Sequence, residues 1–211
     1  KFVSVYGTQH STQITVSVLP CSLEIPIDTQ PNNLSFNHRA LAIAHMGMNC
    51  PYAPMMKDNI LALDDSSYRY NYNIVECHGS SAFATNDPAR SNVAGILDDL
   101  QNPIGYPTLF LNLYNCEILN TADTSAFIYN ANSALDNCVK KEGADVGISM
   151  AVASLEDEVY CRANIKSAKH DEYRVNAWLL ENNIYAANQS GAYKDYHFIY
   201  NHVLRNVSEE V

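Results

Sequence analysis

The stretch Arg39-Ala-Leu-Ala-Ile-Ala-His-Met-Gly-Met-Asn-Cys-Pro-Tyr-Ala-Pro54 decides the fold of this chain. From Arg39 to Ala44 the residues form a short, nearly continuous apolar run, which is typical of a strand covered on both faces. Pro51 fits the first turn of a helix, because the N–H that proline lacks has no partner there. We therefore expect a buried strand that leads into a helix beginning near Cys50 and ending at about Leu63.

A second stretch, Gly105-Tyr-Pro-Thr-Leu-Phe-Leu-Asn112, is expected to meet the first in space. It consists of a proline turn followed directly by an apolar run, which predicts another buried strand. A thiol at a helix N-terminus, facing an X-Pro turn, is the layout of a thioredoxin-like domain. The candidate site of the chain is therefore Cys50 together with Pro107.

Strands and helices are expected to alternate up to residue 143. The pattern predicts a strand at 70–77, a helix at about 88–100, a strand at 108–113 and a helix at about 124–141. Asp123-Thr-Ser125 supplies the N-cap signal of the last helix, and Gly143 ends it. This order of elements is that of an α/β core.

Beyond Gly143, apolar and polar residues alternate along several short segments, for example from Val146 to Val152. Successive segments of this kind, joined by short turns, indicate an antiparallel sheet or sandwich. The predicted fold class is therefore α/β plus all-β, with a thioredoxin-like α/β core and an antiparallel β-sandwich-like module. The expected division is an N-terminal β segment at 1–30, a thioredoxin-like domain at 31–143 and a truncated β module at 144–211.

The composition excludes some classes of partner. The 211 residues carry a formal net charge of −10 and no cluster of Lys and Arg, which phosphate binding needs, so no nucleic-acid partner is expected. No apolar run approaches the ~18 residues of a membrane-spanning helix, and the N-terminal residues lack a signal-peptide pattern. An exported form would therefore be a processed chain. No spacing of Cys or His residues indicates a metal site, and no cofactor is expected.

The sequence contains six cysteines: Cys21, Cys50, Cys77, Cys116, Cys138 and Cys161. An even number permits three disulfides, and the alternative is a set of buried free thiols. Two pairings are candidates, Cys50 with Cys77 and Cys116 with Cys138. Each requires Cα atoms within roughly 7 Å of one another.

Three stretches resemble the Omp28-related outer membrane protein family of Bacteroidetes-type bacteria. The first is Asn49-Cys-Pro51 after the buried strand, similar to the family's Cys-x-Asn-Cys-Pro region. The second is Gly105-Tyr-Pro-Thr-Leu-Phe110, similar to the cis-proline turn of thioredoxin relatives. The third is Tyr200-Asn-His-Val-Leu-Arg205, similar to the family's His-Asn-His-Val-Leu-Arg. Together they span the chain from about residue 36 to its end.

The resemblance implies a thioredoxin-like domain combined with a β-sandwich-like module. It also implies a cis peptide bond before Pro107, rather than a trans proline at the first residue of a strand. The implied location is the periplasm, or the outer membrane and cell surface, with a removed N-terminal anchor as the sole link to the membrane. A protein or cell-envelope partner and a further portion beyond Val211 are implied as well.

The chain departs from the family at the thiols. In the family's register Gly47 stands where the first, nucleophilic cysteine would be, and in a glutaredoxin-like register Ala53 replaces the resolving one. With a single thiol, a mixed disulfide on Cys50 would wait for an external reductant. The helix N-terminus is nevertheless expected to lower the pKa of the Cys50 thiol.

Four further polar residues near these stretches are expected to have structural roles. His45 and His78 lie near strand ends beside the candidate site, and hydrogen-bonded structural groups are a simpler interpretation than catalytic bases. His202 and Arg205 lie three residues apart in a predicted strand, so their side chains point to opposite faces and do not form one site.

Two hypotheses about function follow. The first is a non-catalytic, exported cell-envelope protein whose thioredoxin-like core is a scaffold for binding or structural interaction, since fold alone does not confer activity. The second is a thiol–disulfide oxidoreductase or monothiol exchange protein that uses Cys50, with Pro107 shaping the substrate groove.

Overall fold

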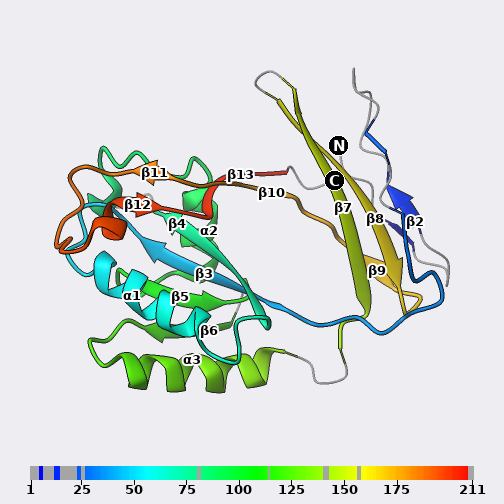
Figure 1. The fold of residues 1–211 in the computed structure, drawn as a ribbon, viewed down its shortest axis with the longest axis horizontal. Helices are drawn as coiled ribbons and strands as arrows, with labels where there is room; N and C mark the ends of the chain where they lie inside the picture. The colour runs from blue at the N-terminus through cyan, green and yellow to red at the C-terminus, as the bar shows by residue number, and fades with distance from the viewer. Residues whose placement is uncertain are drawn as a thin grey trace. The chain divides into compact units, whose positions relative to one another are not determined.

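The computed structural model describes residues 5–6, 12–14, 23–24, 27–79, 82–113, 115–139, 143–155 and 158–208. The chain forms two compact units. The core unit consists of residues 39–140 and 178–207, and the β unit consists of residues 1–38, 141–177 and 208–211. Figure 1 labels the helices and strands of both units.

The core unit is built on a six-stranded sheet with the strand order β10-β13-β4-β3-β5-β6. In chain order its strands are β3 (Ala40–Met46), β4 (Tyr72–His78), β5 (Thr108–Leu111), β6 (Asn115–Leu119), β10 (Trp178–Glu181) and β13 (Val203–Val207). The pairs β3–β4 and β4–β13 are parallel, and the other three pairs are antiparallel. The apolar run after Arg39 is thus an inner strand of a mixed sheet, as its pattern predicts.

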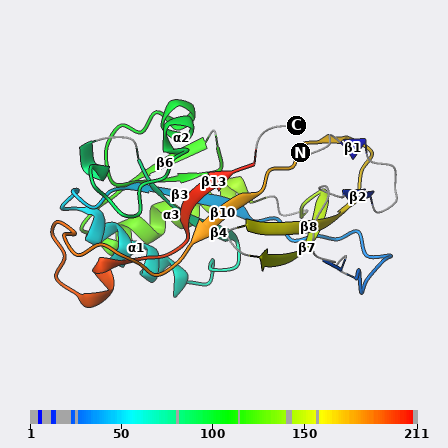
Figure 2. The same ribbon diagram turned by 90° about the horizontal axis from the view of Figure 1, so that it is seen from above.

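Helices cover both faces of this sheet, as Figures 1 and 2 show. Helices α1 (Ala53–Asp64) and α3 (Thr124–Cys138) pack on one face, and α2 (Ala94–Gln101) packs on the other. Strand β3 carries apolar side chains on both faces of the sheet. Ala42 and Ala44 belong to the apolar cluster on the α1 and α3 side, Ile43 belongs to the cluster on the α2 side, and all three are fully buried.

Local residues explain where helices α1 and α3 begin. Helix α3 begins after Asp123, whose carboxylate accepts a hydrogen bond from the Ala126 N–H at 3.0 Å, as the N-cap signal predicts. Helix α1 begins at Ala53 rather than near Cys50, and Pro54, not Pro51, lies in its first turn. The Cys50 thiol therefore belongs to the turn before the helix and not to its first turn.

The β unit consists of antiparallel sheets. Strands β7 (Val146–Leu155) and β8 (Glu158–Ser167) pair along their whole length, and β2 (Thr12–Ile14) adds to β8. Strands β1 (Val5–Tyr6) and β9 (Glu172–Tyr173) form a second sheet. The predicted fold class, an α/β core with an antiparallel β module, is confirmed.

The division of the chain differs from the expected boundaries in two main respects. Residues 31–38, expected in the thioredoxin-like domain, belong to the β unit. The sequence pattern assigns residues 144–211 to a single β module, whereas residues 178–207 belong to the core unit. Strand β13 pairs in parallel with β4, with Val203 opposite Glu76. The physical reason is burial, because Val203 and Leu204 are completely enclosed in the two apolar clusters of the core unit.

A small hairpin and two short 3-10 turns complete the core unit. Strands β11 (Ile184–Tyr185) and β12 (Ile199–Tyr200) pair antiparallel and close the base of the intervening loop. The turns are η1 (Ala82–Ala84) and η2 (Asp195–Phe198). We call residues 186–198 the cover loop.

Candidate functional site

The two predicted stretches meet in the core unit. The Tyr106–Pro107 peptide bond is cis, which confirms the prediction for Pro107. The Cys50 thiol lies 3.5 Å from the carbonyl oxygen of Tyr106, within hydrogen-bond distance for sulfur. The layout of a thioredoxin-like site, a thiol before a helix opposite a cis-proline turn, is therefore present.

The thiol itself is closed to solvent. Cys50 is 1% exposed. Burial raises the pKa of its thiol, and the backbone N–H groups of Tyr52 and Ala53 offset this only in part. The expectation that the helix N-terminus lowers this pKa is wrong, because the cost of burying a thiolate exceeds the gain from the helix. Since the thiolate is the nucleophile, Cys50 is a weak one.

Gly47 shows that the missing thiol cannot be restored by a simple substitution. A Cβ atom built on Gly47 would lie 2.5 Å from the backbone carbonyl oxygen of Phe83, a distance that real Cβ contacts essentially never show. The same carbonyl accepts a hydrogen bond from the Asn49 N–H at 2.8 Å. The backbone at Phe83 thus occupies the space that a first cysteine would need.

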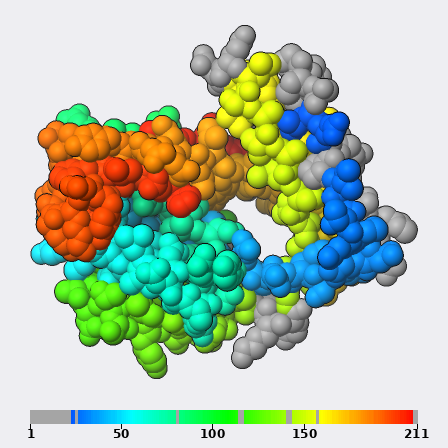
Figure 3. Space-filling model, viewed as in Figure 1, coloured from blue at the N-terminus to red at the C-terminus, as the bar shows by residue number. Residues whose placement is uncertain are grey.

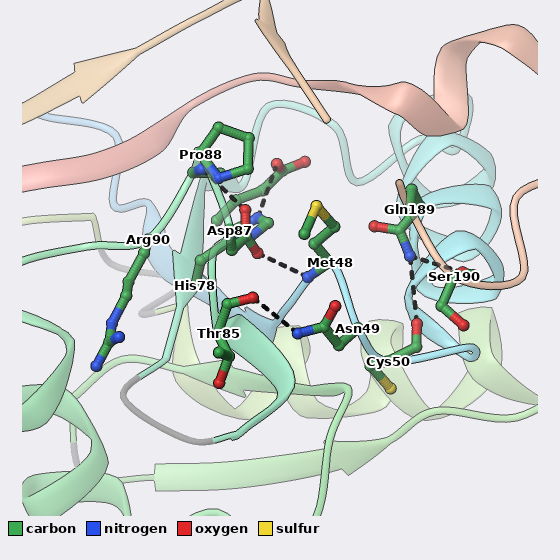
Figure 4. A network of polar contacts seen from close by, with 12 residues as sticks. Met48, Asn49, Cys50, His78, Thr85, Asp87, Pro88, Arg90, Gln189 and Ser190 are labelled. Carbon is green, nitrogen blue, oxygen red and sulfur yellow. Dashed lines mark hydrogen bonds and ion pairs between the residues drawn. The ribbon is translucent and has the colours of Figure 1, made fainter. Parts of the chain in front are cut away.

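Asp87 holds the segment after η1 against the Cys50 turn. Its Oδ2 accepts a hydrogen bond from the Met48 N–H at 2.6 Å and lies 2.6 Å from His78 Nδ1. Its Oδ1 accepts a bond from the Ala89 N–H at 2.8 Å. Figure 4 shows Asp87 between His78 and Met48. His78 is completely buried, which agrees with the hydrogen-bonded structural group that the sequence predicts.

The His78–Asp87 pair favours its charged form. Burial works against a charged His78, but the hydrogen bonds and charges of Asp87 and Glu76 outweigh it and raise the His78 pKa. Burial likewise opposes ionisation of Asp87, while the hydrogen bond and charge of His78 lower the Asp87 pKa below its usual range. Both shifts favour the ionised form of this buried pair.

Arg205, from the third family-like stretch, supports the same segment from outside. Its guanidinium donates hydrogen bonds to the carbonyl oxygens of Pro88 and Arg90 at 2.9 and 3.1 Å, and its Nε bonds Glu181 at 2.6 Å. His202 is exposed, has a φ of 55° and donates its N–H to Asn182. His202 lies outside β13, so the alternation of a strand does not relate the two side chains, and their role in packing or at an interface stays a prediction.

The cover loop closes the other side of the Cys50 turn. The Ser190 N–H bonds the Met48 carbonyl at 2.9 Å, and the Gln189 amide bonds the Cys50 carbonyl at 3.3 Å. Gly191 has a φ of 72°, and a Cβ there would lie 2.3 Å from the Pro51 carbonyl oxygen, so glycine is required for this approach. Figure 4 shows Gln189 and Ser190 beside Cys50.

His45 takes part in a separate network on the α2 side of the sheet. Its Nε2 lies 2.5 Å from Gln101 Oε1 and its Nδ1 lies 3.2 Å from Asp98 Oδ1. The Tyr106 hydroxyl donates to the same Asp98 oxygen at 2.7 Å. His45 is completely buried, so it ties β3 to α2 and to the cis-proline turn rather than facing a substrate.

The predicted disulfide between Cys50 and Cys77 is absent, because both are free thiols. Cys50 belongs to the apolar cluster beneath α1 and α3, and Cys77 to the cluster beneath α2, so the sheet separates them. Burial, and then the charge of Asp98, raises the pKa of the Cys77 thiol. The side chain of Cys116 is outside the described residues, so its pairing with Cys138 stays a prediction.

No pattern in the sequence indicates the buried polar group that lies beneath the cover loop. Lys57, on α1, donates to the carbonyl oxygens of His197 and Ile199 and lies over the Tyr200 ring, 4.1 Å from its centroid. Burial lowers the Lys57 pKa, and the charge of Glu76 opposes this. Among the described residues, no group of three or more His, Cys, Asp and Glu side chains could hold a metal ion.

Comparison with known proteins finds similarity in structure but not in sequence. No protein-family model and no curated protein matches the sequence. HBP35 of Porphyromonas gingivalis is structurally similar, with a TM-score of 0.62 and 17% identity; the match covers 83% of this chain and 58% of that one. Protein AGR_C_4864 from Agrobacterium tumefaciens has a TM-score of 0.51 and 15% identity, with 81% of this chain and 72% of that one covered.

At these identities the likeness shows the fold alone. The HBP35 fold is thioredoxin-like, so the predicted thioredoxin-like core is confirmed. The chain spans 58% of the length of HBP35. The resemblance to the Omp28-related family stays a prediction.

Proposed function

We propose that this chain is a non-catalytic, exported protein of the bacterial cell envelope. Its thioredoxin-like core unit acts as a scaffold for binding a protein or cell-envelope partner. The observation that carries the proposal is the closed state of the redox position. The Cys50 thiol is 1% exposed with a raised pKa, and the Phe83 carbonyl fills the space a second cysteine at position 47 would need.

Disulfide exchange needs two properties that the core unit lacks. The attacking sulfur must be an accessible thiolate, and the mixed disulfide must be released by a second thiol. In the described structure, Asp87 and the cover loop enclose the Cys50 turn from two sides. These contacts hold the surroundings of the thiol in one arrangement, which suits a rigid scaffold.

The envelope location is supported by the resemblance of three stretches of the chain to an outer membrane protein family. None of the described helices is long and apolar enough to cross a membrane. A binding partner of the scaffold is expected to be a protein or another envelope component.

The test is an insulin-reduction assay with dithiothreitol as electron donor. The wild-type chain and Cys50→Ser are compared at equal concentration, with an active thioredoxin as positive control. We expect both chains to match the uncatalysed rate, since the second thiol is missing. Turnover by the wild type that Cys50→Ser abolishes would refute the scaffold proposal.

A second candidate, monothiol exchange, is favoured by one observation. The Cys50 sulfur still lies 3.5 Å from the Tyr106 carbonyl, beside the cis peptide bond of Pro107. Incubation with oxidised glutathione followed by intact-mass measurement separates the two candidates. A glutathione adduct on the folded wild type but not on Cys50→Ser would support exchange, and no adduct would support the scaffold.

A further inference from the structure

The two ends of the cover loop join the core unit next to each other. Its base is the β11–β12 hairpin, in which Ile184 pairs with Tyr200 and Tyr185 with Ile199. The Ala186 N–H continues the ladder with a hydrogen bond of 2.8 Å to the Phe198 carbonyl. A loop whose two ends are held side by side can move without disturbing the sheet. Figure 3 shows this loop, in orange to red, on the surface next to α1 in cyan.

Polar contacts, rather than apolar burial, hold the loop down. Tyr193 is 65% exposed and Tyr196 is 36% exposed, although both are large aromatic residues. Within the loop, Ala186, Gln189 and His197 are buried. Segments with few buried apolar contacts are the ones that open locally at low free-energy cost.

A single carboxylate carries most of the attachment to α1. Asp58 accepts hydrogen bonds from the hydroxyls of Tyr193 and Tyr196. The same carboxylate lies 3.0 Å from the Lys194 ammonium and 3.0 Å from His197 Nε2. The Lys194 ammonium also lies over the Tyr193 ring, 5.1 Å from its centroid. Four side chains of one loop therefore depend on one acceptor.

Hydrogen bonds from the same loop reach the Cys50 turn. The donors are the Ser190 N–H and the Gln189 amide, and the acceptors are the backbone carbonyls of Met48 and Cys50. The backbone of Gly191 also rests against the Pro51 carbonyl. The turn that carries the thiol is thus held on one side by Asp87 and on the other by the loop that Asp58 secures.

We propose that the cover loop is a lid, latched by Asp58, whose opening releases the turn at 48–51 and exposes Cys50. This goes beyond the scaffold proposal, which requires a closed thiol but no means of opening it. The lid is closed when Asp58 is ionised and occupied by its four donors.

The test is site-resolved alkylation of the folded, full chain with iodoacetamide, compared between wild type and Asp58→Asn. Lys57 and Arg69 separate Cys50 from Cys77, so trypsin places the two thiols on different peptides. Three of the four donors bond Asp58 Oδ1 and the fourth bonds Oδ2. The substituted amide lacks the charge of the carboxylate and replaces one of these acceptor oxygens by an NH₂ group, which cannot accept a hydrogen bond, so the latch is broken. We expect Cys50 alkylation to rise about 10-fold or more, with Cys77 unchanged.

Three controls make the result decisive. Asp65→Asn makes the same charge change at the exposed C-cap of α1 and should leave the alkylation rates of Cys50 and Cys77 at wild-type values. Lys194→Gln removes one of the four donors and should give a smaller rise at Cys50. Hydrogen exchange at the Ser190 amide should accelerate in Asp58→Asn, while β3 stays protected.

Two outcomes would overturn the lid. One is an unchanged Cys50 alkylation rate in Asp58→Asn. The other is an equal rise in the alkylation rates of Cys50 and Cys77. Because the sheet separates these two thiols, such a rise would report a general loosening of the core unit and not the opening of a lid.

Discussion

Gly47 is the residue whose surroundings leave no room for a second thiol near Cys50. Its missing side chain lets the Phe83 carbonyl approach the backbone and accept the Asn49 N–H. Restoring a cysteine there should therefore not restore a working pair of thiols. We predict that Gly47→Cys lowers the free energy of unfolding by about 1–3 kcal/mol through overpacking. It should also show no insulin reduction.

Gly95→Cys is the matched control for this substitution. A Cβ at Gly95 meets no atom within 4 Å, so the same change of residue type has room there. Urea unfolding of both variants gives the comparison. A Gly47→Cys variant as stable as Gly95→Cys, or one that reduces insulin, would show that the position is open after all.

The buried His78–Asp87 pair should make stability depend on pH. The pKa of His78 is raised in the folded state, so its contribution is full below the unfolded pKa of about 6.5 and is lost as pH rises through the folded pKa. The pKa of Asp87 is lowered, so its contribution is full above about pH 3.9 and is lost as pH falls through the folded pKa. The pair therefore stabilises most between these limits.

Replacing one partner should remove this dependence. We predict that Asp87→Ala costs about 3–5 kcal/mol near pH 6, because it leaves His78 buried without its partner. The cost should shrink above the folded pKa of His78, as measured by urea unfolding at a series of pH values. His170→Gln alters an exposed histidine and should keep the wild-type profile. A cost that is the same at every pH would be inconsistent with an ion pair.

At the scale of the elements, α3 depends on its cap. Asp123 accepts the Ala126 N–H and satisfies one of the unpaired donors of the first turn. We predict that Asp123→Ala lowers the free energy of unfolding by about 1 kcal/mol. Asp65→Ala, at the C-terminal end of α1, removes a carboxylate of the same size from an exposed position and should cost less. Equal costs would show that the cap bond contributes nothing.

Periodicity and caps predicted the central elements well. Strand β3, helix α1, strand β4 and helix α3 lie within a few residues of their expected positions, because each has a strong local signal in its own residues. Strand β6 was missed, since Asn115–Leu119 is short and partly polar and its pairing with β5 is what defines it.

The candidate site could be predicted only in part, for a related reason. Cys50 and Pro107 carry recognisable local motifs, and the structure brings them together. Phe83, Asp87 and Asp58 close and secure the site, but their partners are distant in the sequence and no local pattern marks them. The same holds for β13, whose place beside β4 depends on burial in a core built from segments distant in the sequence.

At the scale of the whole chain, residues 178–207 complete the core unit. Tyr200, Val203 and Leu204 are fully buried in it, and β13 supplies a strand of its sheet. We predict that a fragment of residues 39–140 does not fold alone, although a boundary near residue 143 is what the sequence pattern indicates. Circular dichroism and urea titration should show no cooperative transition for this fragment. A cooperative transition like that of the full chain would mean that 178–207 is dispensable.

The central claim is that burial makes the Cys50 thiol unreactive, although the backbone around it keeps a thioredoxin-like arrangement. The most direct measurement is the rate of Cys50 alkylation by iodoacetamide as a function of pH, followed on its own tryptic peptide. Because burial raises the thiol pKa, the rate should still be rising above about pH 8.5, the usual value for a free cysteine. A rate that levels off below about pH 7 would reveal a stabilised thiolate and contradict the closed, non-catalytic scaffold.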